Sequence, residues 1–158
     1  MSRIHVEAER LLNARADQVY SILADYRTRH PSILPPQNFL DYTVESGGQG
    51  AGTIVRFRMH AGGRDRLYRM EVSEPDPGRV LRERDTTSSL VTTFTMTPVG
   101  DGAQTSVRIA TEWEGARGIG GFFERTFAPG VIRSVYEQEL GMLAAAAGAG
   151  AASGQQAS

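Results

Sequence analysis

Apolar and polar residues alternate with a period of two near the beginning of the chain. Ile4, Val6, Ala8 and Leu12 follow this alternation, which Arg10 interrupts once. Such a pattern is typical of a strand that turns one face to a core and the other to water. We therefore predict a first strand over this segment.

Helical spacing replaces the alternation after a polar break at residues 13–17. Apolar residues between positions 19 and 23 recur at this spacing, which predicts a short helix over residues 16–25. The following segment, residues 25–38, contains three prolines. Because proline lacks a backbone N–H and restricts the residue before it, we predict a second helical turn and then an ordered loop.

Six further strand patterns follow, and each ends at a cluster of turn-forming residues. They predict strands over residues 39–46, 53–61, 64–74, 79–85, 90–99 and 105–113. The turn signals between them lie at the intervals expected of hairpins. The strands should therefore run as an antiparallel meander.

A helical period returns after the last strand. Apolar residues at this spacing predict a long helix from about residue 117 to residue 147. Pro129 falls inside this helix, where the lost hydrogen bond predicts a kink or a break. We expect residues 1–147 to form one domain and residues 148–158, rich in Gly, Ala, Ser and Gln, to form a flexible tail.

A sheet of this length needs a cover for its apolar face, and the last helix is the only large candidate. We therefore predict an α+β domain with a seven-stranded antiparallel sheet curved around the C-terminal helix. Two short helices follow the first strand. A sheet that bends around a single helix leaves a hollow beside it, and this hollow is the candidate ligand site.

Several short motifs occur in a familiar order along the chain. They are residues 13–20 (Asn-Ala-Arg-Ala-Asp-Gln-Val-Tyr), 23–26, 50–53, 74–79 and 95–98 with the Gly-Asp-Gly turn that follows. Together they resemble the START-like, or birch-allergen-like, superfamily with its helix-grip fold, and within it the bacterial polyketide cyclase/dehydrase-type branch (SRPBCC proteins). The resemblance covers about residues 3–146, with Arg15 where relatives commonly have proline and Tyr20 where they have tryptophan.

This resemblance implies a helix-grip fold around a cavity, but it does not identify one function. The superfamily includes binders, transporters and enzymes on the same fold. For this chain it implies binding or transport of a small hydrophobic ligand, or a cofactor-free cyclase or dehydratase of the polyketide aromatase type. We expect no cofactor in either case.

Composition and charge exclude several classes of function. The net charge is −1, so nothing in the charge favours a nucleic acid or a membrane surface as partner. The chain has no cysteine, and all 17 positively charged residues are arginine, which excludes thiolate sites and a Schiff-base lysine. No run of about 18 apolar residues is present, and the N-terminus lacks a signal-peptide pattern. We expect a cytoplasmic protein, either a monomer or a homodimer.

Strand alternation assigns the side chains that should surround the hollow. Aromatic and methionine side chains in this set suit a flat or flexible apolar ligand. The predicted ligand-binding residues are Tyr26, Tyr42, Phe57, Met59, Tyr68, Met70, Thr92, Phe94, Thr111, Trp113, Phe123 and Phe127.

Three residues are candidates for acid–base chemistry: Glu83, His30 and Tyr68. Alternation places Glu83 and Asp85 on the apolar face, where desolvation raises the pKa of a carboxyl group. Alternatively, the strand end bends outward and both acids reach solvent. His30 lies in the loop near the expected cavity mouth, where it either packs the loop or transfers a proton.

Other polar groups favour simpler interpretations. No two of the three histidines have metal-ligand spacing, so we predict no metal site. The glycine-rich segment 47–52 joins two strands and lacks the helix and lysine of a phosphate-binding loop. The arginines on one predicted hairpin should lie on its outer, solvated face; they are Arg56, Arg58, Arg64 and Arg66.

Three functions remain open from the sequence. The first is a non-catalytic binder or carrier of a small hydrophobic molecule, such as a lipid, a polyketide or an aromatic metabolite. The second is the cofactor-free cyclase, with Glu83, His30 or Tyr68 moving the proton. The third is an interaction module whose groove docks a partner protein, which requires a filled interior and an exposed apolar stripe.

Overall fold

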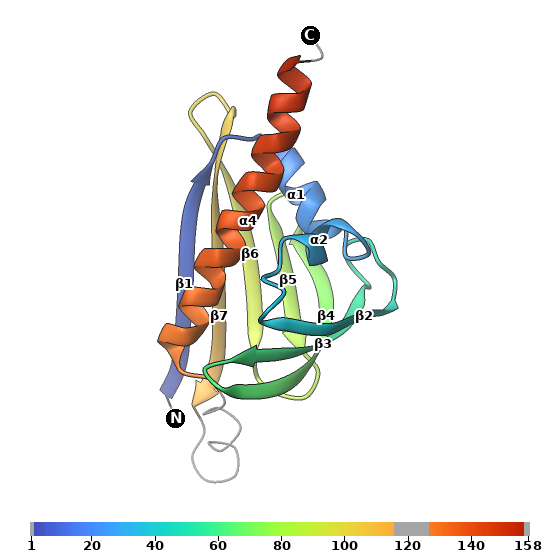
Figure 1. Cartoon of the computed structure of the whole chain (residues 1–158), viewed down its shortest axis with the longest axis vertical. Coiled ribbons are helices and arrows are strands. Elements are labelled where there is room, and N and C mark those ends of the chain that lie inside the picture. The colour runs from blue at the N-terminus through green and yellow to red at the C-terminus, as the bar shows by residue number, and fades with distance from the viewer. Residues whose placement is uncertain (1, 116–126, 157–158) are drawn as a thin grey trace.

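The computed structural model describes residues 2–115 and 127–156. Its elements, in chain order, are β1 (Ser2–Leu12), α1 (Ala16–Ala24), α2 (Arg29–Ser32), β2 (Phe39–Ser46), β3 (Ile54–Ala61), β4 (Arg64–Asp76), β5 (Val80–Asp85), β6 (Val91–Val99), β7 (Gln104–Gly115) and α4 (Pro129–Gln156). Figure 1 shows α4 lying across the concave side of a curved sheet, with α1 and α2 beside its upper half.

The sheet has seven strands in the order β1-β7-β6-β5-β4-β3-β2. Every adjacent pair is antiparallel, from Val6 opposite Thr111 at one edge to Phe57 opposite Tyr68 near the other. Consecutive strands from β2 to β7 are neighbours, and β1 pairs with the last strand. The predicted α+β fold and its antiparallel meander are confirmed.

The segment that carries α1 and α2 closes over one end of the sheet. Gln18 caps α1, because its side-chain oxygen accepts a hydrogen bond from the backbone N–H of Arg15 at 3.2 Å. Val19, Ile22 and Leu23 of this helix are almost completely buried. The short helix α2 therefore stands beside the concave face, and it brings His30 to the interior.

The C-terminal helix begins later than its hydrophobic pattern suggests. Pro129 is the first residue of α4, which agrees with the predicted break at this proline and not with a kink inside one continuous helix. Proline suits the first helical position, where its missing N–H has no intrahelical partner and its fixed φ is already helical. The helix extends to Gln156, past the predicted end near residue 147. Residues 116–126, including Phe123, lie outside the described part of the chain.

One stripe of α4 packs into the fold. Its buried residues recur three or four positions apart, as expected for a helix with one apolar face. They are Ile132, Val135, Tyr136, Glu139, Leu140, Leu143 and Ala147. The stripe runs along β1 and faces the concave side of the sheet. One member of it, Glu139, is an acid.

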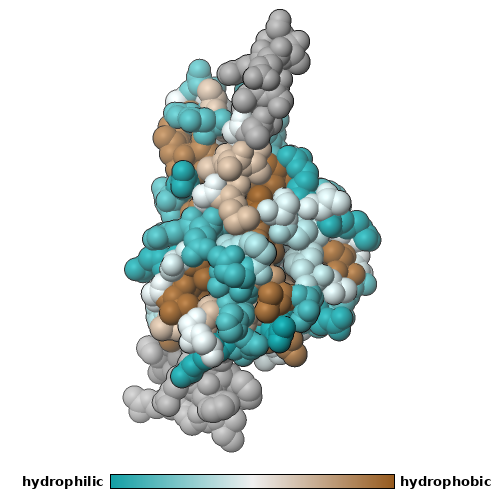
Figure 2. All heavy atoms as spheres, in the orientation of Figure 1, coloured by the Kyte–Doolittle hydropathy of each residue, from teal (hydrophilic) through white to brown (hydrophobic). Residues whose placement is uncertain are grey.

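The face in view carries mostly hydrophilic side chains, and its apolar side chains lie in separate patches (Figure 2). Among the described residues, the large hydrophobic side chains that remain exposed are Leu11, Leu67 and Val99. Within the same residues, no helix has both the length and the hydropathy needed to cross a bilayer.

Candidate ligand-binding site

A cavity lies between the concave face of the sheet and the helices α2 and α4. It encloses about 760 Å3 when the part open to solvent is included. The wall is formed by Tyr26, His30, Leu34, Phe39, Tyr42, Val55, Phe57, Met59, Arg66, Tyr68, Met70, Glu83, Leu90, Thr92, Phe94, Thr111, Trp113, Phe127, Ile132, Tyr136 and Glu139.

The structure places the predicted ligand-binding residues together on this wall. Every one of them within the described segments lines the cavity, and Phe123 lies outside those segments. The inward orientation of the residues on strands was predicted correctly because alternate residues of one strand point to the same face of the sheet. The catalytic candidates Glu83, His30 and Tyr68 also lie on the wall. Helix α4 contributes Ile132, Tyr136 and Glu139 to the wall.

Aromatic rings form much of the apolar surface near β2, β3 and β4. The ring centroids of Phe39 and Phe57 are 5.3 Å apart, and those of Phe57 and Tyr68 are 5.6 Å apart. These separations are within the range of attractive ring contacts. The rings thus give one side of the cavity an aromatic surface that an apolar molecule can contact.

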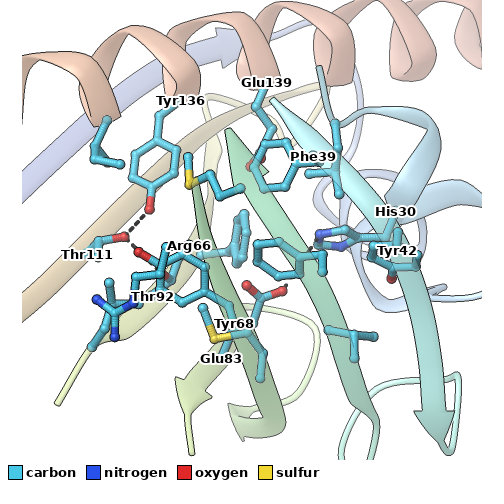
Figure 3. Close-up of a pocket in the computed structure, with 18 of the residues that line it drawn as sticks. His30, Phe39, Tyr42, Arg66, Tyr68, Glu83, Thr92, Thr111, Tyr136 and Glu139 are labelled. Atoms are coloured by element: carbon cyan, nitrogen blue, oxygen red, sulfur yellow. Dashed lines mark hydrogen bonds and ion pairs between the residues drawn. The ribbon is translucent and has the colours of Figure 1, made fainter. Parts of the chain in front are cut away.

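A polar cluster of Glu83, Tyr26 and His30 lies among these apolar groups. The Tyr26 hydroxyl donates a hydrogen bond to Glu83 Oε2 at 2.7 Å. His30 Nε2 lies 3.7 Å from the same oxygen. Glu83 is 8% exposed and His30 is 3% exposed, so both groups are held away from bulk water. Figure 3 shows Glu83 and His30 approaching each other across the cavity.

The orientation of His30 is fixed by its other ring nitrogen. Its Nδ1 lies 2.7 Å from the carbonyl oxygen of Leu23, which can only accept, so Nδ1 carries a proton. The Nε2 atom is then free to face Glu83 as an acceptor or, when protonated, as a donor. The ring also stacks on Tyr26, with centroids 4.4 Å apart, and meets the edge of Phe94. The ring of His30 is therefore held in one orientation, with Nε2 toward Glu83.

Two acids on β5 are buried, so the alternative in which the strand end bends outward is wrong. Glu83 points into the cavity, and Asp85 is only 2% exposed on the same face. Asp85 is held by the backbone N–H of Arg69 and by the hydroxyls of Thr87 and Ser88. These donors satisfy its carboxylate, so the strand keeps its alternation to the end.

Arg66 corrects a second expectation. The predicted position on the outer face of the hairpin is wrong, because Arg66 shares the inward face of Tyr68, two residues away, and lines the cavity. Its guanidinium carbon lies 4.8 Å from the centroid of the Tyr68 ring, a cation–π contact. Its Nη2 also lies 3.5 Å from Asp85 Oδ2. The period of two predicts this placement once Tyr68 is assigned inward.

Three hydroxyl groups form a second polar cluster along the wall. The Oγ1 atoms of Thr92 and Thr111 are 2.8 Å apart on the neighbouring strands β6 and β7. The Thr111 oxygen also bonds the hydroxyl of Tyr136, which comes from α4 (Figure 3). Burial raises the pKa of Tyr136, so this hydroxyl keeps its proton. The cluster joins the sheet to the helix and offers both donors and acceptors to the cavity.

The tyrosines near Glu83 also remain neutral. Burial and the charge of Glu83 raise the pKa of Tyr26 well above its ordinary value. The same causes, with Asp25 added, raise the pKa of Tyr42. The Tyr42 hydroxyl donates to the backbone oxygen of Tyr26 at 2.7 Å. These phenols therefore act as hydrogen-bond donors.

Glu139 is a site residue that the sequence analysis did not identify. It comes from α4, is 3% exposed and lines the cavity opposite Glu83. Desolvation, with a contribution from Glu83, raises the pKa of its carboxyl group well above the usual value. Helical spacing could have identified it, because Glu139 lies four residues before Leu143 and therefore on the same apolar stripe of the helix.

The polar groups of the wall do not resemble a metal centre. Within residues 2–115 and 127–156, no group of three His, Asp or Glu side chains is arranged to hold a metal ion. The wall consists of an apolar surface, several hydroxyl groups, the guanidinium of Arg66, the pair of His30 and Glu83, and one further acid.

Comparison with known families agrees with this architecture. The model of the family "Polyketide cyclase / dehydrase and lipid transport" matches residues 3–148. The chain belongs to this family. The predicted resemblance to START-like proteins is thus confirmed over nearly the whole chain. No curated protein matches the chain.

Solved structures share the fold of this family member. The solution structure of KanY protein is 34% identical, covers 93% of this chain and 99% of its own, and has a TM-score of 0.79. The protein TTHA0849 from Thermus thermophilus is 21% identical over the same shares of the two chains, with a TM-score of 0.73. Norcoclaurine synthase from Thalictrum flavum, solved with dopamine and hydroxybenzaldehyde, is 16% identical over 87% of this chain and 84% of its own, with a TM-score of 0.65.

Proposed function

We propose that this protein binds a small hydrophobic molecule, such as a lipid, a polyketide or an aromatic metabolite, in the cavity between its sheet and α4. The cavity itself is the observation that carries this proposal. Aromatic, aliphatic and methionine side chains form most of its wall, and it opens to solvent. An interaction module would instead need a filled interior and an exposed apolar stripe, and the described residues have neither feature.

Burial of apolar surface would supply most of the affinity. At about 25 cal/mol per Å2, burying about 200 Å2 of ligand surface contributes about 5 kcal/mol before the costs of association. The hydroxyls of Thr92, Thr111 and Tyr136 would then orient the ligand through hydrogen bonds. Binding by this mechanism requires no catalytic step.

Native mass spectrometry of the purified protein tests the proposal. We expect a population whose mass exceeds that of the chain by a small organic molecule, which is released under denaturing conditions. The substitution Val55→Phe, which places a ring in the cavity, should abolish this population. Val44→Phe on the neighbouring strand β2 is the matched control, because Val44 pairs with Val55 but does not line the cavity. Equal ligand retention by the two variants would contradict binding in the cavity.

The buried pair of His30 and Glu83 supports a second candidate function, proton transfer in a cyclase or dehydratase. A general base must lie in a water-excluded site within reach of the substrate, and both groups line the cavity. The Tyr26 hydroxyl and the Leu23 carbonyl hold Glu83 and His30 in place. Such a pair could remove a proton from a β-keto chain and return one to a leaving hydroxyl.

Turnover of a β-keto substrate separates the two candidates. A cyclase should lose about 100-fold or more of its kcat on Glu83→Gln or His30→Ala, since a positioned acid–base group contributes about that much. A binder should show no turnover, and Glu83→Gln should leave its ligand retention unchanged.

A further inference from the structure

Two buried polar atoms on the cavity wall, Glu139 Oε2 and Trp113 Nε1, have no hydrogen-bond partner among the described residues. Glu139 is only 3% exposed. A buried polar atom left in this state costs free energy, so such atoms are rare in folded proteins. Figure 3 shows the side chain of Glu139 reaching from α4 toward the sheet, above Glu83.

The other charged groups of the cavity each have a neighbour of opposite charge or a neutral donor. Glu83 accepts from Tyr26 and faces His30. Arg66 lies near Asp85 on the sheet. The titratable groups that act on Glu139 from the elements around it are Glu83, Tyr26 and Tyr136, and none of them is a cation. Burial therefore favours the uncharged form of Glu139, which presents an O–H donor.

We propose that Glu139 is a ligand-binding residue that donates a hydrogen bond from its neutral carboxyl group to a carbonyl oxygen of an uncharged aromatic ligand. This inference rests on the proposed function, because it assumes that the cavity takes an apolar guest. It deepens that function by naming the group that selects the ligand. Apolar molecules that lack an acceptor oxygen would leave Glu139 unsatisfied.

A cationic ligand is the main competitor, since an ammonium group would pair with a Glu139 carboxylate. Two features of the wall oppose it. The guanidinium of Arg66 already places a positive charge on the wall. The Trp113 Nε1 atom, also buried and without a hydrogen-bond partner among the described residues, can only donate. Trp113 and a neutral Glu139 are both hydrogen-bond donors, so each would be satisfied by an acceptor oxygen on the ligand.

Three naphthalenes of nearly equal shape provide the test. They are 2-acetylnaphthalene, a neutral ketone; 2-ethylnaphthalene, which lacks oxygen; and 2-(1-aminoethyl)naphthalene, a cation at neutral pH. Dissociation constants are measured by isothermal titration calorimetry with the full chain at pH 7. We expect the ketone to bind about five- to tenfold more tightly than the hydrocarbon, the effect of one net hydrogen bond. The cation should bind more weakly than the ketone.

Variants of Glu139 assign this preference to its carboxyl group. Glu139→Leu should remove the preference for the ketone, whereas Glu139→Gln should keep it within about twofold, because the amide still donates. Glu137→Leu is the matched control, an exposed acid on the same helix that should leave the preference unchanged.

Each other pattern has a distinct meaning. An unchanged ketone preference in Glu139→Leu would overturn the role of Glu139 while leaving the cavity as a binding site. Tighter binding of the cation than of the ketone, lost in Glu139→Leu, would overturn the neutral form of the residue. If none of the three compounds binds, this inference fails, whereas the proposed function fails only if the native mass spectrometry also shows no retained ligand.

Discussion

Individual buried polar residues distinguish this cavity from an ordinary apolar core. Glu83, His30 and Glu139 all lie at the interface of sheet and helices, and each is almost entirely removed from water. Glu83 and His30 have partners in the protein, whereas one oxygen of Glu139 has none among the described residues. An unsatisfied acid in that position lowers the stability of the fold. Replacing Glu139 therefore tests whether the residue serves function rather than stability.

The stability of the protein should depend on pH through Glu139. Its pKa is raised in the folded state, so the folded chain keeps a proton that the unfolded chain releases above its ordinary value of 4.5. The free energy of unfolding therefore falls as pH rises through that value toward the folded pKa. Between about pH 5 and about pH 8, we expect urea denaturation to show a steeper fall for the wild type than for Glu139→Gln, by up to about 1.4 kcal/mol per pH unit.

The control for this effect is Glu137→Gln, which changes an exposed acid on the same helix. This variant should follow the pH dependence of the wild type. If Glu139→Gln also follows the wild type, the carboxyl group of Glu139 is as well solvated in the folded protein as in the unfolded chain, and the electrostatic account of this residue is wrong.

Tyr26 should contribute to stability through its bond to Glu83. The substitution Tyr26→Phe removes a donor 2.7 Å from a buried carboxylate oxygen, and His30 Nε2 lies too far away, at 3.7 Å, to replace it fully. We expect a loss of about 1–3 kcal/mol in the free energy of unfolding. Tyr20→Phe, which removes a part-buried bond to Glu74, should cost less in the same denaturation experiment. A larger loss for Tyr20→Phe would contradict this ranking.

At the scale of elements, the central strands were predictable because β3 and β5 alternate between buried and more exposed residues along their whole length, and β6 does so over most of its length. The inward face of β4 continues from Met70 through Tyr68 to Arg66, although hydrophobicity marks only its apolar members as inward-facing. Glu83 and Asp85 extend the inward face of β5 in the same way. Hydrophobicity alone assigns such charged residues to the outer face. They are stable on the inner face only because partners distant in the sequence satisfy their charges.

The C-terminal helix illustrates what local patterns leave undetermined. The same proline that disrupts the interior of a helix is favoured at its first turn, so Pro129 by itself fits two interpretations. In the structure Pro129 takes the second role, as the first residue of α4. Glu139 was missed for a related reason: a single acid on an apolar stripe is assigned to solvent unless the stripe is followed residue by residue.

Packing of α4 against the sheet should dominate the stability of this element. Leu143 is completely buried, so Leu143→Ala should lower the free energy of unfolding by about 2–5 kcal/mol through lost contacts and a new cavity. Ala145 is exposed on the same turn, and Ala145→Ser should cost about 0.5 kcal/mol or less. Thermal or chemical denaturation measures both. Similar losses for the two variants would mean that α4 does not pack along the buried stripe described above.

At the scale of the whole molecule, α4 packs along β1 and lies across the concave side of the sheet (Figure 1). The cavity lies between this face of the sheet and α4, with α2 at its side. The helix therefore has two roles along one face: Leu140 and Leu143 pack the core, while Ile132, Tyr136 and Glu139 face the cavity. A ligand in the cavity would contact both this face of α4 and the sheet.

Heteronuclear NMR titration of the full chain with 2-acetylnaphthalene tests directly whether this cavity admits a guest. The chain has one tryptophan, Trp113, so a single indole N–H signal reports on the cavity wall. We predict saturable shifts of that signal and of backbone amides on the inner strands β6 and β7 and on α4. Shifts gathered around exposed positions such as Leu67, or no saturable shift of the indole signal, would contradict the account.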